Sequence, residues 1–405
     1  MNYETRGGAS RSRVLLLALL ALALTALAMP ALGAAAKKKK DPDVTVMTRN
    51  LYLGADLGPA IDATSICGAV DAGGTILNQV DLTNFPERSK LLAKEIAKAD
   101  PDLVGLQEVA LWREQTPSDF TATPATQVRY DFLALLQSAL KKAGAKYTVA
   151  VQQDEFDQEL PADVDGSDAT GNGPLAGCGA DKDGRLTMRD VILVRKGSGV
   201  KTSKPDMGHF VNQYKVNLGG VLPISVTRGW VSVDAKVAAT KRTKAAKFHF
   251  VNTHLEAFGD PQIRANQARE LIAPAGEYDE KGPLQTKKQL IFLGDINSGG
   301  PKDKVGTGFT TAGDEGAYNV LTQDFGMFNL GARQTCCYPD PNLSSTTIGS
   351  FRFDHTVDHV MTKPKLKQVS AKVTGTNPTV TTPSGLVSSD HGGLVSTLSL
   401  KPPKK

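Results

Sequence analysis

This chain of 405 residues lacks the motifs of several common enzyme classes. It has no G-x-S-x-G motif, which argues against the nucleophile elbow of serine hydrolases. It has no G-x-x-x-x-G-K-[ST] loop, which argues against the NTPases that use one. Its four cysteines show neither C-x-x-C spacing nor a Cys/His pattern, so no zinc site is predicted. We also find no internal repeat and no linker that would separate a second core.

A strong excess of one charge is also missing, although the formal net charge is +5. Without residues 1–36 the chain carries 44 basic and 41 acidic residues, and seven of the basic ones are lysines in two terminal runs. The body between the runs is therefore slightly acidic, at about −4. The body therefore lacks the excess of basic residues that is typical of a dedicated nucleic-acid-binding protein. It suits a concentrated carboxylate site that holds a cation.

One long apolar run is present, from Val14 to about Leu32, after three arginines. Ala34-Ala35-Ala36 follows as a small-residue cleavage site, so we interpret residues 1–36 as a secretory signal peptide. A transmembrane anchor is the alternative, because the run approaches the length of a membrane span. The expected protein is secreted, with no stable membrane insertion after cleavage.

The four cysteines suggest disulfides in an exported protein. Cys67 and Cys178 lie in Gly-rich stretches, and Cys336 and Cys337 are adjacent. Three pairings are open at this point.

Strand and helix patterns alternate from residue 43 onward. Strands are expected at 44–50, 102–109, 146–152, 189–195, 224–237, 246–257, 291–297, 356–363, 367–374 and 392–400. Helices are expected at 86–99, 127–141 and 261–271, and long loops at 55–84, 112–126 and 152–187. We therefore predict one α/β domain at 43–400, a basic flexible segment at 37–42 and a basic tail at 401–405.

Polar residues recur where these strands end. "IFLGDINS" gives Asp295 and Asn297, which point the same way because side chains alternate along a strand. The other strand ends supply Asn50, Glu108, His254, Asp358, Asp390 and His391. Each residue alone would be an ordinary turn former. Together they predict a site, since α/β folds build sites at strand ends and adjoining loops.

In this order the Gln-Glu, Asn-Thr-His-Leu, Gly-Asp-x-Asn and Ser-Asp-His elements resemble the endonuclease/exonuclease/phosphatase superfamily. That group contains deoxyribonuclease-like nucleases, sphingomyelinases and inositol-polyphosphate phosphatases. The resemblance covers about residues 43 to 400. It implies a four-layer sandwich, with two mixed β-sheets packed face to face and helices outside.

The resemblance also implies roles for the matching residues. Asn50, Glu108 and Asp390 are expected at the metal. Asp295 and Asn297 are expected to orient the nucleophile and contact the phosphate. His254 should stabilise the phosphoryl oxygens or protonate the leaving group, and His391 should be the general base, held by Asp358. A carboxylate on one ring nitrogen stabilises the imidazolium that forms when the other takes a proton.

Two positions depart from the family pattern. The arginine of the family's Arg-Ile-Asp is replaced, since this chain has Thr356-Val357-Asp358. Asp354-His355 and Asp358-His359 form a near repeat, and we prefer Asp358 because its segment continues as a strand. Asp190 is either a buried partner of a site histidine or a strand-edge carboxylate. The acidic stretches at 163–168 and 181–187 are calcium-loop fragments or ordinary turns.

The predicted metal ligands are carboxylate and amide oxygens, so we expect the bound cation to be Mg²⁺, with Mn²⁺ as an alternative. The function we predict is a secreted, monomeric, metal-dependent phosphoesterase in which activated water attacks phosphorus. Nucleic acid is the favoured substrate on family frequency. A sphingomyelinase or phospholipase activity and a small-molecule phosphatase are alternatives, although Trp112 and Trp230 supply few aromatics for membrane contact. A non-catalytic exported binding module that keeps the fold is the rival from another class.

Overall fold

The computed structural model describes residues 39–402 except 168–170, 172, 221, 279–280, 301–313 and 332–333. The chain divides into two units, Met1–Lys40 and Asp41–Lys405, and all the named helices and strands lie in the second. The expected signal peptide lies outside the described residues, as do parts of both lysine runs. No helix in the described ranges has both the length and the hydropathy needed to cross a membrane.

Two mixed sheets form the centre of this unit. In the described residues the first has eight strands in the order β15-β16-β1-β2-β6-β3-β4, with β5 also beside β6. Its strands are β1 Asp43–Asn50, β2 Leu103–Gln107, β3 Leu111–Gln115, β4 Gln127–Asp131, β5 Tyr147–Ala162, β6 Lys182–Arg195, β15 Lys367–Thr374 and β16 Gly393–Ser399. β1 and β2 are parallel and the other neighbours are antiparallel.

The second sheet has six described strands in the order β13-β14-β12-β11-β10-β7. They are β7 Val200–His209, β10 Gly229–Val237, β11 Ala246–His254, β12 Gln289–Asp295, β13 Phe328–Asn329 and β14 Asp358–Lys363. β11 and β12 are parallel. A separate two-stranded sheet consists of β8 Tyr214–Leu218 and β9 Leu222–Val226.

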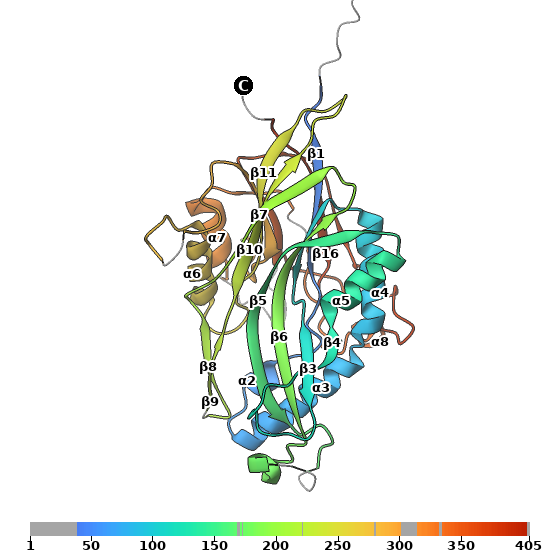
Figure 1. The fold of residues 1–405 in the computed structure, drawn as a ribbon, viewed down its shortest axis with the longest axis vertical. Helices are drawn as coiled ribbons and strands as arrows, with labels where there is room; N and C mark the ends of the chain where they lie inside the picture. Colours follow the sequence, from blue (N-terminus) through green and yellow to red (C-terminus); the bar gives the residue numbers. More distant parts are fainter. Residues whose placement is uncertain are drawn as a thin grey trace, which may run out of the picture. The chain divides into compact units, whose positions relative to one another are not determined.

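The helices cover the outer faces of the two sheets (Figure 1). They are α2 Gly58–Ile61, α3 Ile66–Leu82, α4 Phe85–Ala99, α5 Phe132–Lys142, α6 Pro261–Ile272, α7 Gly316–Asn319 and α8 Ser345–Ile348, with a 3-10 turn η1 Gly173–Cys178 and a π turn η2 Val320–Asp324. One apolar cluster joins α3, α4 and α5 to the first sheet, and another joins α6, α7 and η2 to the second. A third cluster fills the space between the sheets, for example with Val46, Phe250 and Leu293. The predicted four-layer sandwich is therefore confirmed.

The loop expected at 55–84 is wrong, because α3 fills most of it. Gly73 and Gly74 lower helix propensity in the middle of this segment, which is why the sequence suggests a loop. In the fold, a Cβ on Gly73 would lie 2.9 Å from the backbone oxygen of Pro161. The glycines are thus needed for the close approach of α3 to β5, and packing outweighs propensity.

The loop expected at 152–187 is wrong at both of its ends, since β5 and β6 pair through residues 152–162 and 182–187 and only the middle part lies outside the two strands. Asp157 of β5 accepts hydrogen bonds from Arg185 and Thr187 of β6 and from Arg113 of β3. Such cross-strand pairs offset the low strand propensity of aspartate.

Three smaller boundaries also differ from the prediction. β3 occupies the start of the loop expected at 112–126. The helix expected at 127–141 begins only at Phe132, because Asp131 caps it by accepting the amide hydrogen of Leu133 at 3.1 Å. The strand expected at 224–237 is interrupted at Thr227 and Arg228, between β9 and β10.

Candidate active site

The sheet registers bring the predicted residues to one edge of the sandwich. Asn50 ends β1 opposite Gln107, the last residue of the parallel strand β2, so that Glu108 follows at the same edge. In the second sheet, Asp295 is paired with both His254 and Asp358. Strands that are far apart in the sequence therefore present their polar ends together.

Hydrogen bonds join the carboxylates of the two sheets. The side-chain nitrogen of Asn50 donates to Glu108 Oε1 at 2.9 Å and to Asp295 Oδ2 at 3.1 Å. The backbone amide of Leu53 donates to Glu108 Oε2 at 2.7 Å, and that of Asn297 donates to Asp295 Oδ1 at 3.0 Å. Asn50 thus orients two acids, while its own oxygen accepts from the Tyr52 amide at 2.8 Å.

His391 is held by Asp358, with 2.9 Å between Nδ1 and Asp358 Oδ2. Its other nitrogen, Nε2, lies 3.6 Å from Asp295 Oδ2. Burial works to lower the pKa of His391, but Asp358, Asp390 and Asp295 outweigh it and hold the pKa well above its usual range. Of the two sequence registers, Asp358 is therefore the partner of His391, and Asp354 instead contacts His355 at 2.7 Å. We call Asn50, Glu108, Asp295, Asp358 and His391 the edge cluster.

His254 is fixed by a residue that the sequence patterns do not single out. Arg228, in the turn between β9 and β10, lies with Nη1 3.1 Å from His254 Nδ1. A guanidinium can only donate, so Nδ1 accepts and the ring proton is on Nε2. Burial, together with the charge of Arg228, lowers the pKa of His254 to about 3. Nε2 lies 3.7 Å from Asp295 Oδ2, which can accept its hydrogen, and 3.1 Å from Asn297 Nδ2, which donates to the backbone oxygen of Leu255 at 3.0 Å.

Arg228 belongs to a second buried group that lies behind the first. Glu155, Asp190, Arg228 and Glu256, which we call the interior cluster, come from the faces and turns between the two sheets. Burial and the charge of the neighbouring acid raise the pKa of Glu155 well above its usual range. Asp190 accepts from the backbone amide of His254, so it supports the histidine's main chain and not its ring.

Other buried arginines hold the segments that carry the site. Arg88 of α4 donates to the backbone oxygens of Leu51 at 2.8 Å and Ser388 at 3.0 Å. Arg49 donates to the backbone oxygen of His391 and to Glu95. The sequence gives no signal for these roles, since an arginine in a helix or strand pattern indicates a solvated position.

The carboxylates fit a divalent cation. Burial, and then repulsion from Asp390, raise the pKa of Glu108, and a cation between the two acids would relieve both effects. Asp358 Oδ1 has no hydrogen-bond donor in the described part of the chain. Ligand atoms of Asp295, Asp358 and His391 also lie within 4.8 Å of one another. The donor set is mainly carboxylate oxygen, which suits Mg²⁺.

Both cysteine pairs form disulfides, Cys67–Cys178 and Cys336–Cys337. The second lies against the site, with its sulfur atoms 3.7 and 3.6 Å from His391 Nε2. The sequence left this pairing open, and only the fold places it.

The calcium-loop fragments behave as turns. Asp163 Oδ1 accepts the amide hydrogens of Gly166 and Ser167, and Asp181 Oδ1 accepts that of Val164. In the described residues, no group of three potential ligands occurs in this loop.

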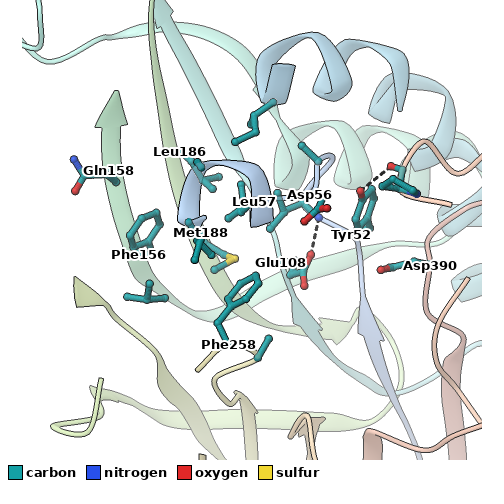
Figure 2. A pocket seen from close by; sticks show the side chains of 18 of the residues that line it. Tyr52, Asp56, Leu57, Glu108, Phe156, Gln158, Leu186, Met188, Phe258 and Asp390 are labelled. Carbon is teal, nitrogen blue, oxygen red and sulfur yellow. Dashed lines mark hydrogen bonds between the residues drawn. The ribbon is translucent and has the colours of Figure 1, made fainter. Parts of the chain in front are cut away.

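The predicted residues lie at one end of a cavity of about 250 Å³. Glu108, His254, Asp295, Asn297, Asp390 and His391 line it, and Asn50 and Asp358 support them from behind. Figure 2 shows Asp390 at one side of the lining and Phe156 and Gln158 at the other, with Glu108 and Met188 between them. All eight predicted residues therefore belong to one site.

No family model matches the sequence, and no curated protein does. Solved structures do match. An endonuclease/exonuclease/phosphatase from Bacteroides vulgatus has 15% identity and a TM-score of 0.46, covering 89% of this chain and 100% of that one. D. rerio TDP2 complexed with a single-strand DNA product has 16% identity and a TM-score of 0.44, covering 88% and 99%.

A mannosyl-6-phosphatase from Bacteroides thetaiotaomicron has 15% identity and a TM-score of 0.44, again covering 88% and 99%. At such identities and TM-scores, these likenesses decide nothing about chemistry, which depends on the geometry of the site. As a finding about structure, the chain matches proteins described as endonuclease/exonuclease/phosphatase family members over about nine tenths of its length.

Proposed function

We propose that this protein is a metal-dependent phosphodiester hydrolase. The observation that carries the proposal is the Asp358–His391 pair. The second ring nitrogen of His391, Nε2, faces Asp295 in a cavity that Glu108 and Asp390 also line. This arrangement joins a base, its orienting carboxylate and a set of hard-cation ligands.

The proposed reaction uses each part of the site in turn. A water oxygen forms a bond to phosphorus while its proton passes to His391 Nε2, and Asp358 stabilises the imidazolium. The P–O bond to the leaving group breaks, and the ester oxygen departs with the electron pair and takes a proton from solvent. A divalent cation at Glu108 and Asp390 would supply neutralisation of the phosphate charge.

His254 has a separate role in this proposal. With Nδ1 occupied by Arg228, its Nε2–H is a fixed donor that can bind a phosphoryl oxygen beside the Asn297 amide. A pKa of about 3 leaves the ring neutral at physiological pH. We therefore assign it stabilisation of the phosphoryl oxygens and not protonation of the leaving group.

The base requires a neutral His391, and the acids around it oppose this. Asp390 is one of the groups that raise the pKa of His391. A cation bound at Asp390 would neutralise the charge of this carboxylate, so the pKa of His391 would fall toward the range of a general base.

The test is hydrolysis by the full chain with Mg²⁺ and with EDTA. The substrates tested are DNA, RNA, sphingomyelin, bis-p-nitrophenyl phosphate and inositol phosphates. The sequence resemblance favours the nucleic acids among them. Glu108→Gln, which keeps the size of the side chain, should lower kcat by about 10³-fold or more through loss of a cation ligand. Wild-type activity that survives exhaustive EDTA treatment would contradict the metal assignment, and binding without turnover would favour a non-catalytic module.

A further inference from the structure

The cavity extends beyond the acids into a region whose walls are almost entirely apolar. We call this region the apolar channel, and its walls include Ile76 of α3, Phe156 of β5, Leu186 and Met188 of β6, and Val216 and Ile224 of the two-stranded sheet. Ile76, Leu186, Met188 and Ile224 are themselves buried. The channel begins at Glu108, so a molecule with its phosphate at the acids would place its next atoms here (Figure 2).

The channel lacks the charges that a polyanion needs. Among the described residues that line the cavity, Arg228 is the one arginine or lysine, and it is engaged by His254 and Glu256. Asp56 and Asp340 add negative charge to the lining. Nucleic-acid sites instead neutralise successive phosphates with Lys and Arg. The lining therefore favours a molecule with one phosphate and an apolar remainder.

The sheet of β8 and β9 forms the outer wall of the channel. Inward-facing Val216, Leu218, Ile224 and Val226 are buried or half-buried, while their neighbours along both strands are exposed. The connecting turn contains Gly219, which has a φ of +60° and packs so that a Cβ would lie 2.7 Å from the backbone oxygen of Ser65, just before α3. The wall is thus closed at its tip against the helix side of the cavity.

We propose that the apolar channel binds the hydrocarbon chain of a single-chain amphiphilic phosphodiester, of the lysophospholipid type, while its phosphate lies at the edge cluster. This inference rests on the proposed function. The whole cavity, with its acidic end, has a volume of about 250 Å³, which is below the roughly 300–1,000 Å³ of ligand pockets and suits one chain better than two. Burial of that chain supplies binding energy that a short diester lacks.

The experiment compares three p-nitrophenyl phosphodiesters, in which the other ester group is methyl, butyl or octyl, at monomeric concentrations with Mg²⁺. We expect kcat/KM to rise about fourfold for each methylene that enters the channel, and thus roughly 60-fold or more from methyl to octyl once at least about three of the added methylenes enter it. Binding of dodecylphosphocholine below its micelle concentration is measured in parallel by calorimetry, without metal.

Variants then locate the effect. Leu186→Trp should fill the channel and reduce the octyl-to-methyl ratio to below about fivefold, since about one methylene or less would then be buried. Val216→Asp is the second variant, because its half-buried side chain is less critical for folding. Val369→Asp is its matched control: it makes the same change on β15, where the side chain is 52% exposed, and should keep the wild-type ratio.

The outcomes distinguish failure of the apolar channel from failure of the proposed phosphodiester hydrolysis. Hydrolysis that is independent of chain length, without dodecylphosphocholine binding, overturns the channel and leaves the phosphodiesterase. If no ester is hydrolysed but dodecylphosphocholine binds to wild type and Val369→Asp and not to Val216→Asp, the channel stands and the proposed reaction fails. Absence of both hydrolysis and binding overturns both.

Discussion

The edge cluster and the interior cluster are both buried groups of charged residues, but their oxygen atoms are satisfied very differently. In the edge cluster, Asp358 Oδ1 is the one carboxylate oxygen without a donor in the described chain. In the interior cluster both oxygens of Glu155, one of Asp190 and one of Glu256 have none. A buried acid without donors costs stability, so the two clusters serve different purposes.

The difference follows from where the two clusters lie. At the strand ends, loop amides such as those of Leu53 and Asn297 are free to bind carboxylates and fix their direction. Between the sheets most backbone amides are already used in the ladders. Asp190 still accepts the amide hydrogen of His254 and Glu256 accepts those of Ala257 and Phe258, whereas Glu155 accepts none in the described chain, and Arg228 is the ion-pair partner of Glu256. We infer that the edge cluster performs the chemistry, whereas the interior cluster keeps the arginine that holds His254.

The largest expected effect is on the base of the edge cluster. His391→Ala should lower kcat by about 10²–10⁴-fold while KM changes little, because proton transfer occurs in the transition state. Steady-state kinetics on bis-p-nitrophenyl phosphate measure both constants.

His209→Ala is the control, since this exposed histidine on β7 contacts Gln153 and the Asp154 backbone and no edge-cluster residue. It should leave kcat near the wild-type value. Equal losses in both variants would show that His391 is not the base.

The edge cluster was predictable because its residues lie at the ends of strands or within two residues of them. A strand's end is visible in the sequence from its apolar run, and strand pairing then leaves little freedom in where Asp295 or Asn50 can point. The predicted strand at 44–50 and the predicted helix at 86–99 match β1 and α4 within a residue. Local patterns sufficed there.

The interior cluster was not predictable. Arg228 occupies a short turn inside what reads as one continuous strand, and its partners lie in another segment, with His254 at the end of β11 and Glu256 two residues later. The segments 55–84 and 152–187 were misassigned for a related reason, since their structure depends on close packing and cross-strand ion pairs. Propensity is a weak guide where long-range contacts decide.

A smaller effect is expected where the two clusters meet. Arg228→Lys keeps the charge, but one ammonium cannot donate to His254 and Glu256 in the geometry of a guanidinium. We expect kcat to fall by about tenfold, as a misaligned phosphoryl donor would cause. The ¹⁵N spectrum of His254 should show a mixture of tautomers.

Arg185→Lys is the matched control on β6, where the arginine pairs with Asp157 at the surface. It should change neither kcat nor the histidine spectrum. A single Nε2–H tautomer in Arg228→Lys would contradict the positioning role of Arg228.

The smallest expected effect concerns the interior cluster alone and is read as stability. Because the folded-state pKa of Glu155 is raised, by burial and by Asp190, its contribution to stability is fully present below the unfolded pKa of about 4.5 and is lost as the pH rises through the folded value. Glu155→Gln removes this loss. Its stability should therefore fall less than that of wild type between pH 5 and pH 8, so that its Tm exceeds the wild-type Tm increasingly over this range in thermal unfolding of the metal-free protein. Glu277→Gln, the same change at an exposed position, should follow the wild-type pH profile. If Glu155→Gln is instead less stable than wild type at pH 8, Glu155 is ionised and supports Arg228 as a charged partner, and the contrast between the two clusters would be smaller than the hydrogen bonds indicate.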